Sequence, residues 1–169
     1  MKINIALSKD AVFVLDSLGI NPLTYGPAYG GESAGLDLYN VGPEITLPTH
    51  HVWTAMGEKA IMIPTGVYVS LPSDTVGLIK ERGSITKSGL ISRAGVIDPG
   101  YSGEIFINLV NIGGQKVTIP TGAKLPVQLV VMPCFNNFKV ITGNEFVELS
   151  KNNKREKGSL GSSDNQQGK

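Results

Sequence analysis

The feature that most constrains the fold is a series of short, β-branched apolar segments, each bounded by glycine or proline. From about Ile45 onward the chain reads KAIMIPTGVYVSLP, TVGLIKERG, GEIFINLVNIGG and QKVTIPTGAKLPVQLVVMP. Such segments with turn residues at their ends are typical of antiparallel strands in sandwiches and barrels. Helical periodicity is nearly absent. The sequence therefore predicts an all-β fold.

Turn chemistry and polarity divide the chain into three parts. Two apolar runs end in Pro-Thr-Gly, at 63–66 and 119–122, where proline fixes φ and glycine tolerates a positive φ. We expect residues 1–33 to form an N-terminal strand and an extended loop leading into the core. Residues 34–149 are predicted to form the β core, and the polar residues 150–169 a flexible tail.

Composition excludes several functional classes. The 15 basic and 14 acidic residues among 169 create no global field, so we expect neither a nucleic-acid nor a membrane partner. Cys134 is the only cysteine, which excludes an internal disulfide and favours a reducing compartment. The N-terminal residues do not resemble a signal peptide, and no apolar run reaches a membrane span. We expect a cytoplasmic protein, or one in the cytoplasm of a host if the chain is viral.

The run AGVIDPGYSGE holds the first candidate for catalysis. Asp98 lies at the shoulder of a predicted hairpin, between the apolar Val96 and Ile97 and the turn Pro99-Gly100. A sheltered carboxylate there accepts a proton from water if the site holds that water near phosphorus. The alternative is an Asp that caps the turn through its own side chain. Tyr101 is either an ordinary strand aromatic or a flat surface for a nucleoside.

Three further motifs suit an anionic ligand. Arg82, Gly83 and Ser84 follow a predicted strand and offer a guanidinium fork, backbone N–H groups and a hydroxyl for phosphate oxygens. Asp37 in AGLDLY either binds a divalent cation through water or pairs with a basic neighbour. Gln128 is a polar residue in the apolar run VQLVV, so it needs hydrogen-bond partners if buried.

The tail holds the last motif, REKGSLGSS, with Arg155, Ser162 and Ser163. Its glycines and hydroxyls suit anionic oxygens when the tail folds over a ligand, although a solvated chain end is the simpler interpretation. The only histidines, His50 and His51, are adjacent, so a histidine metal cluster or a Ser-His triad is not expected.

Taken in order, AGLDLY, RGS, AGVIDPGYSGE, KLPVQL and REKGSLGSS resemble the five motifs of the trimeric dUTPase family, over roughly residues 33–163. The resemblance implies a β-jelly-roll, also called a β-clip, and the hydrolysis of dUTP to dUMP and pyrophosphate with Mg²⁺. It implies a homotrimer with shared active sites.

The resemblance also implies a role for each site residue. Asp98 would activate the water that attacks the α-phosphorus, Tyr101 would pack on the deoxyribose, and Asp37 would touch Mg²⁺ through its water shell. Two sets of residues would bind the rest of the nucleotide. Those around the hairpin that would read the uracil edge are Ser92, Gly95, Val96, Ile97 and Asp98. Those that would hold the phosphates are Arg82, Gly83, Ser84, Gln128 and, from the tail of another subunit, Arg155, Ser162 and Ser163.

The chain departs from the family pattern at a few positions. Gly83 stands where the second motif usually has serine, and Leu160 where the fifth usually has an aromatic residue. Two alternatives are therefore considered. A dCTP deaminase of the same fold would need a serine and a glutamate where Gly83 and Asn108 stand. A non-catalytic nucleotide-binding regulator would not need Asp98.

Overall fold

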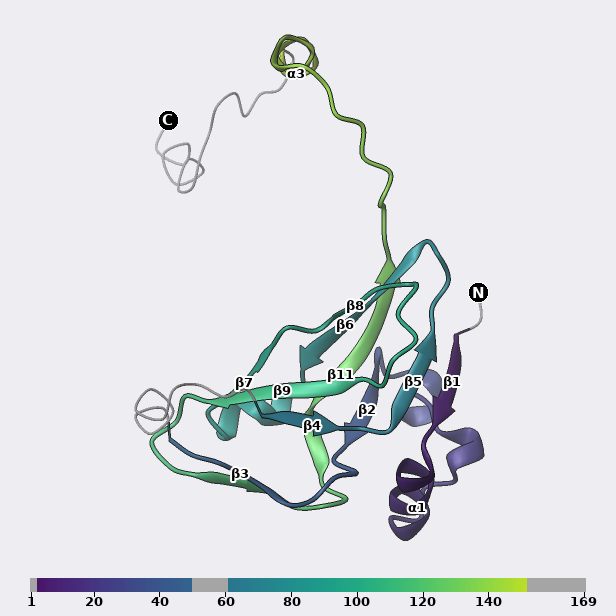
Figure 1. Ribbon diagram of the computed structural model, residues 1–169, viewed down its shortest axis with the longest axis vertical. Helices are drawn as coiled ribbons and strands as arrows, with labels where there is room; N and C mark the ends of the chain where they lie inside the picture. The colour runs from purple at the N-terminus through teal and green to yellow at the C-terminus, as the bar shows by residue number, and fades with distance from the viewer. Residues whose placement is uncertain (1–2, 50–60, 152–169) are drawn as a thin grey trace. The chain divides into compact units, whose positions relative to one another are not determined.

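The computed structural model describes residues 3–49 and 61–151. The chain divides into two units, residues 1–135 and 136–169. The first unit contains every strand that the structure describes, and the predicted all-β fold is confirmed (Figure 1). No helix among the described residues is long and apolar enough to cross a membrane.

The largest sheet has four antiparallel strands. Their order is β2 (Gly35–Tyr39), β11 (Lys124–Pro133), β6 (Thr75–Glu81) and β8 (Val96–Ile97). This order brings segments that are far apart in sequence side by side. As a result, the AGLDLY motif on β2 lies next to the KLPVQL motif on β11, and the RGS motif follows the neighbouring β6.

A second sheet has three strands, in the order β4 (Met62–Pro64), β9 (Phe106–Asn111) and β7 (Leu90–Arg93). Two strand pairs complete the architecture. They are β1 (Asn4–Leu7) with β5 (Val67–Ser70), and β3 (Ile45–Leu47) with β10 (Val117–Ile119).

The main hydrophobic core is one cluster to which both larger sheets contribute, and a smaller cluster of Val14, Leu15 and Tyr39 packs helix α1 (Lys9–Ser17) against β2. The main core is built by period-2 alternation, clearest in β9, where Ile107 and Leu109 are buried while the alternating Asn108 and Val110 are partly exposed. Leu38 of β2 and Leu125 of β11 are fully buried in the same cluster. The burial of these apolar side chains is what fixes the register of the strands that carry the site.

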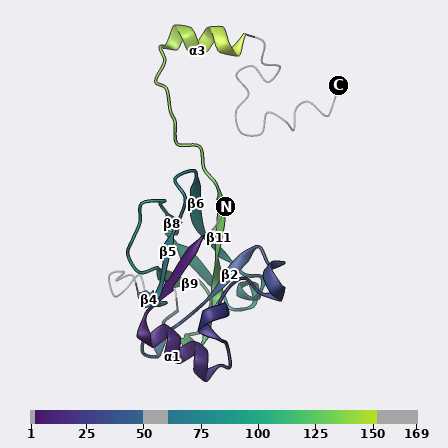
Figure 2. The same ribbon diagram turned by 90° about the vertical axis from the view of Figure 1, so that its right-hand side faces the viewer.

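The N-terminal part differs from the predicted strand and extended loop. After β1 the chain forms helix α1 (Lys9–Ser17), which lies at the end of β1 (Figure 2). Ser8 caps this helix by accepting a hydrogen bond from the backbone N–H of Ala11 at 3.1 Å. Short 3₁₀ helices follow at Pro22–Thr24 and Tyr29–Gly31.

The predicted end of the β core at residue 149 also differs from the structure. Residues 136–149 belong to the second unit, where helix α3 (Gly143–Ser150) forms. Its start is a capping box, in which Thr142 accepts a hydrogen bond from the backbone of Glu145 and the Glu145 side chain bonds back to Thr142. This pair of hydrogen bonds is the local reason for a helix where the core was expected to continue.

Candidate functional site

The hairpin after β7 and the start of β9 surround a hollow of about 250 Å³, here called the hairpin hollow. Five predicted residues line it: Gly95, Val96, Ile97, Asp98 and Tyr101. The structure therefore brings the proposed catalytic carboxylate and the proposed nucleoside platform into one concave site, as the third motif indicated.

A tight turn presents Asp98 at this hollow. The backbone N–H of Tyr101 donates to the Asp98 carbonyl at 3.0 Å, which closes the turn through Pro99 and Gly100. The side-chain cap that the sequence left open does not form, since no group among the described residues donates to the Asp98 carboxylate. That carboxylate is therefore available to a ligand or to water.

Gly95 anchors the hairpin to the large sheet. Its carbonyl accepts a hydrogen bond from the Ile79 N–H at 2.8 Å, and its φ of +124° is one that side chains rarely adopt. A Cβ on Gly95 would stand 2.9 Å from the Ile79 Cβ. Only glycine therefore lets the hairpin approach β6 this closely, and this approach shapes the hollow.

Ser92 does not line the hairpin hollow, although the family resemblance implied that it lies near the base. Its hydroxyl donates to the Glu81 carboxylate at 2.5 Å, and its backbone N–H donates to the same oxygen at 3.3 Å. The Ser92 hydroxyl is the main reason that the pKa of Glu81 lies below its ordinary value. In this structure Ser92 thus ties β7 to the end of β6.

The second hollow, of about 290 Å³, is here called the phosphate hollow because of the groups that line it. It contains the five other described site residues that the sequence predicted: Asp37, Arg82, Gly83, Ser84 and Gln128. Three motifs that are distant in sequence meet there because β2, β11 and β6 are neighbours in the sheet. A site that combines a guanidinium, a hydroxyl and an amide suits phosphate oxygens.

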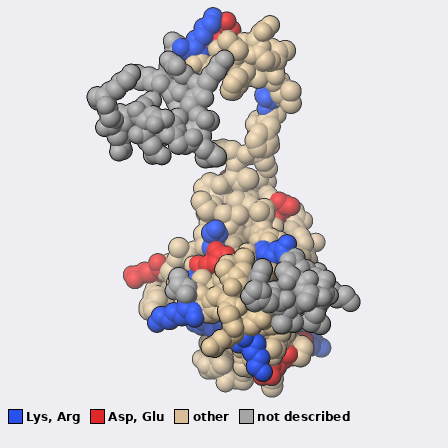
Figure 3. All heavy atoms as spheres, turned by 90° about the vertical axis from the view of Figure 1, so that its left-hand side faces the viewer, with Lys and Arg blue, Asp and Glu red and all other residues tan. Residues whose placement is uncertain are grey.

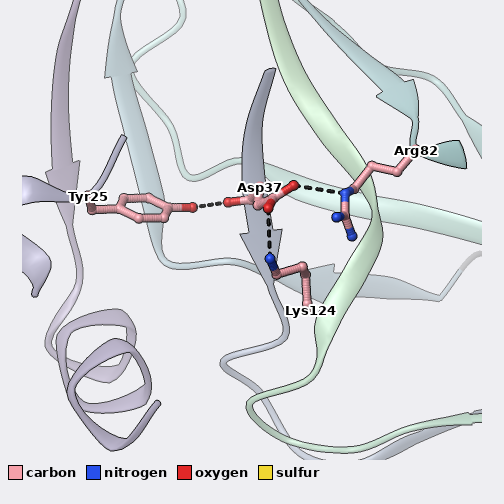
Figure 4. Close-up of polar contacts among 4 residues, drawn as sticks. All are labelled: Tyr25, Asp37, Arg82 and Lys124. Carbon is pink, nitrogen blue, oxygen red and sulfur yellow. Dashed lines mark hydrogen bonds and ion pairs between the residues drawn. The ribbon is translucent and has the colours of Figure 1, made fainter. Parts of the chain in front are cut away.

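Asp37 is the centre of a charged network in this hollow (Figure 4). Its Oδ1 lies 2.8 Å from Nε of Arg82 and its Oδ2 lies 2.8 Å from Nζ of Lys124. The Asp37 carboxylate is only 16% exposed, whereas Lys124 reaches solvent. Of the two alternatives drawn from the sequence, pairing with basic neighbours is the one the structure shows.

The surroundings of the network hold these charges in place. The hydrogen bond to Asp37 raises the pKa of Lys124, which therefore stays cationic. Tyr25 donates its hydroxyl to the backbone carbonyl of Asp37, and burial raises the pKa of that phenol well above its ordinary value. Arg82 is held by its backbone N–H, which donates to the Pro126 carbonyl at 2.9 Å.

Close packing against β11 explains why the first motif carries a glycine at position 35. Leu36 and Gly35 lie opposite Leu129 and Val130 of β11, and a Cβ on Gly35 would stand 2.7 Å from Cδ of Gln128. The Gln128 amide thus occupies the space beside the phosphate hollow that a side chain at position 35 would fill. Gly83, in contrast, has open space where its Cβ would be.

Sequence reasoning missed several residues that line the two hollows. Lys124 is one of them, although it shares a strand with the predicted site residue Gln128 in KLPVQL. Tyr29 and Ser33 fell in a stretch read as an extended loop without a role. Arg93 and Asn108 line the hairpin hollow from β7 and β9. Only strand pairing, which the sequence does not display, brings these two together.

The tail residues Arg155, Ser162 and Ser163 lie outside the described residues, so their proposed part in the site stays a prediction. Among the described residues no cluster of three or more His, Cys, Asp or Glu side chains suits a metal ion. On the face shown in Figure 3, Lys and Arg form several separate groups with acidic side chains among them.

Among the residues that the structure describes, the two hollows have no lining residue in common. Asp98 and Tyr101 belong to the hairpin hollow, while Arg82 and Gln128 belong to the phosphate hollow. The fold defines a β-jelly-roll protein, and it carries two concave sites, one lined by the hairpin with Asp98 and one lined by the Asp37–Arg82 network.

Comparisons with known proteins place this class in a family. The dUTPase family model matches residues 27–164. The deoxyuridine 5'-triphosphate nucleotidohydrolase of Escherichia phage T5 is 38% identical over 123 residues, covering 68% of this chain and 79% of that protein. The chain belongs to the dUTPase family.

Solved structures support the same fold. A mutant dUTPase of Staphylococcus bacteriophage 80alpha, with dUpNHpp, superposes with a TM-score of 0.70 at 21% identity, covering 96% of this chain and 98% of that one. A mutant dUTPase from phage phi11 of S. aureus, described with a structural Mg(II) ion, gives a TM-score of 0.64 at 21% identity, covering 85% and 97%. At these identities the likeness concerns the fold.

Proposed function

We propose that this chain hydrolyses dUTP to dUMP and pyrophosphate, with Asp98 as the general base. The observation that carries the proposal is an Asp98 carboxylate that no described group caps, beside a nucleoside-sized hollow, in a member of the dUTPase family. Water attacks the α-phosphorus and gives its proton to Asp98. The bond from that phosphorus to the bridging oxygen breaks, and pyrophosphate leaves.

The hairpin hollow binds the nucleoside in this proposal. Tyr101 packs on the deoxyribose, and its ring is held because its hydroxyl donates to the Glu104 carbonyl at 2.7 Å. The backbone from Gly95 to Asp98 reads the uracil edge. Ser92 acts indirectly, since its hydroxyl is bonded to Glu81 and so fixes the strand that leads into the hairpin.

The phosphate hollow binds the triphosphate. Arg82 binds phosphate oxygens through its guanidinium. Asp37 engages Nε, so the ion pair orients the remaining N–H groups of Arg82. Gly83, Ser84 and Gln128 supply a backbone N–H, a hydroxyl and an amide. From the tail, Arg155, Ser162 and Ser163 close over the phosphates. These donors stabilise the negative charge that moves onto the leaving pyrophosphate.

Mg²⁺ fits this donor set through the substrate. Asp37 is the one carboxylate in the phosphate hollow, and both its oxygens are engaged by Arg82 and Lys124. A single engaged carboxylate suits a cation that keeps its waters and takes its direct ligands from phosphates. When bound, Mg²⁺ would offset phosphate charge, and Asp37 would help to hold it through its water shell.

Membership of the dUTPase family supports a homotrimer with shared sites. In this proposal Asp98 in the hairpin hollow of one chain and the donors in the phosphate hollow of another chain complete one site. A head-to-tail interface repeated around a three-fold axis pairs the hairpin hollow of each chain with the phosphate hollow of the next. The assembled mass is then three times the 17.9 kDa of one chain.

Subunit complementation tests this arrangement. Asp98→Asn disables the hairpin hollow and Arg82→Ala the phosphate hollow, so each variant alone is expected to be nearly inactive. After joint unfolding and refolding at equal amounts, about a quarter of the sites combine two intact hollows from different chains, and activity returns to that fraction of refolded wild type. A mixture no more active than its components, or a monomeric mass by light scattering, would contradict shared sites.

A further inference from the structure

We propose that Asn108 of β9 selects uracil over cytosine by donating a hydrogen bond from Nδ2 to O4 of the base. This deepens the proposed function and rests on the hairpin hollow being the nucleoside site. No motif that the sequence resembles contains this interaction, because Asn108 lies on the strand after the third motif.

Strand pairing directs the Asn108 side chain into the hollow. Asn108 lies directly opposite Met62 on one neighbouring strand and Arg93 on the other. Opposed residues in antiparallel strands project from the same face of the sheet, and all three of these residues line the hairpin hollow. The flanking Ile107 and Leu109 are buried in the core, and of these two only Ile107 also lines the hollow.

The state of the Asn108 amide is unusual. Among the residues that the structure describes, its Oδ1 is the one buried side-chain polar atom that meets no hydrogen-bond partner. Asn108 lines the hollow, and in the proposal its Nδ2 is the end of the amide that faces the bound base. A buried acceptor without a partner costs stability and calls for an explanation.

Two other asparagines show what a structural amide looks like in this fold. Asn111, on the same strand, donates from Nδ2 to the Gln115 carbonyl at 2.7 Å and accepts from the Gly113 N–H at 2.9 Å. Asn40 likewise donates to the Pro43 carbonyl and accepts from the Gly42 N–H. Both amides are paired at both ends. The Asn108 amide is therefore not fixed by structural hydrogen bonds as these two are, and in the proposal its Nδ2 donates to the bound uracil.

The chemistry of the two pyrimidines makes a donor at this position selective. Uracil carries an acceptor oxygen at C4, whereas cytosine carries an amino group there, so Nδ2 would face another donor. Asp98 and Tyr101 mark the end of the hollow near the sugar, while Asn108 lies at the register of Arg93, away from the turn. The edge of the base remote from the sugar, which includes C4, then faces Asn108.

Two substitutions test the proposal through the ratio of kcat/KM for dUTP to kcat/KM for dCTP. Asn108→Asp replaces the donor by an acceptor, so the ratio is expected to fall by about 100-fold. Asn108→Leu removes the donor without repelling O4, and a fall of about tenfold is expected. Because Asn108→Leu also removes the unpaired Oδ1, its melting temperature should equal or exceed that of wild type.

Val110→Leu is the matched control, since Val110 shares the strand and face of Asn108 but does not line the hollow. Its ratio should remain within twofold of wild type. Unchanged ratios in both Asn108 variants would overturn the inference, as would a lower melting temperature with unchanged preference, which indicates a structural role. Failure of the proposed function is distinguishable from failure of the Asn108 inference, because the wild-type chain would then release no pyrophosphate from dUTP.

Discussion

Asp37 and Arg82 form an ion pair in which the carboxylate Oδ1 lies 2.8 Å from the guanidinium Nε (Figure 4). The pair joins the first and second motifs, and it leaves the terminal N–H groups of Arg82 at the phosphate hollow. In this arrangement Asp37 contributes to phosphate binding chiefly by positioning the guanidinium of Arg82.

This ion pair predicts that Arg82→Lys and Asp37→Asn each raise KM for dUTP by about tenfold. A lysine lacks the planar fork, and an asparagine does not fix Nε of Arg82. Steady-state kinetics at saturating Mg²⁺ provide the measurement. Asp16→Asn is the control, because Asp16 lies in α1 and lines neither hollow. Wild-type KM in both site variants would show that the pair has no part in substrate binding.

The contact between Gly35 and Gln128 predicts different outcomes for two glycine-to-alanine substitutions. Gly35→Ala forces the Gln128 side chain away, because the new Cβ would stand 2.7 Å from Cδ of that residue. We expect KM for dUTP to rise by about fivefold to tenfold through the loss of one phosphate contact. Gly83→Ala meets open space and should change KM by less than twofold. Equal effects in the two variants would contradict this account of Gly35.

The hydrogen bond from Ser92 to Glu81 predicts a pH effect. The pKa of Glu81 lies below its ordinary value, so this bond stabilises the fold above that ordinary value, about 4.3, and the stabilisation is lost as the pH falls through the lowered pKa. Ser92→Ala removes the largest cause, so the pKa of Glu81 should rise toward its ordinary value. NMR titration of the Glu81 carboxyl measures this, and an unchanged pKa would exclude the bond.

Sequence patterning predicted the sheets well because alternation and turn residues are local signals. Both Pro-Thr-Gly turns were expected to use glycine at positive φ, and Gly66 and Gly122 have φ of +62° and +77°. Helix α1 was missed although Ala11, Val14 and Leu15 have helical spacing, because a nine-residue helix carries only one such set.

The site was predicted in part for the same physical reason. Asp98 and Tyr101 are close in sequence, and a local turn brings them together. The pairing of Asp37 with Lys124 depends on the register of β2 and β11, which long-range packing sets. The place of Asn108 beside Arg93 depends on strand pairing in the same way. Contacts across sheets leave no periodic trace in one sequence.

The most direct test of the central claim is pyrophosphate release from dUTP with Mg²⁺ by the full-length chain, wild type against Asp98→Asn. The account predicts turnover by wild type and a loss of at least about 100-fold in kcat for Asp98→Asn, because the amide cannot accept the proton of water. Binding of a non-hydrolysable dUTP analogue should be retained in the variant. Wild-type turnover by Asp98→Asn, or analogue binding by a wild-type chain that releases no pyrophosphate, would contradict the account.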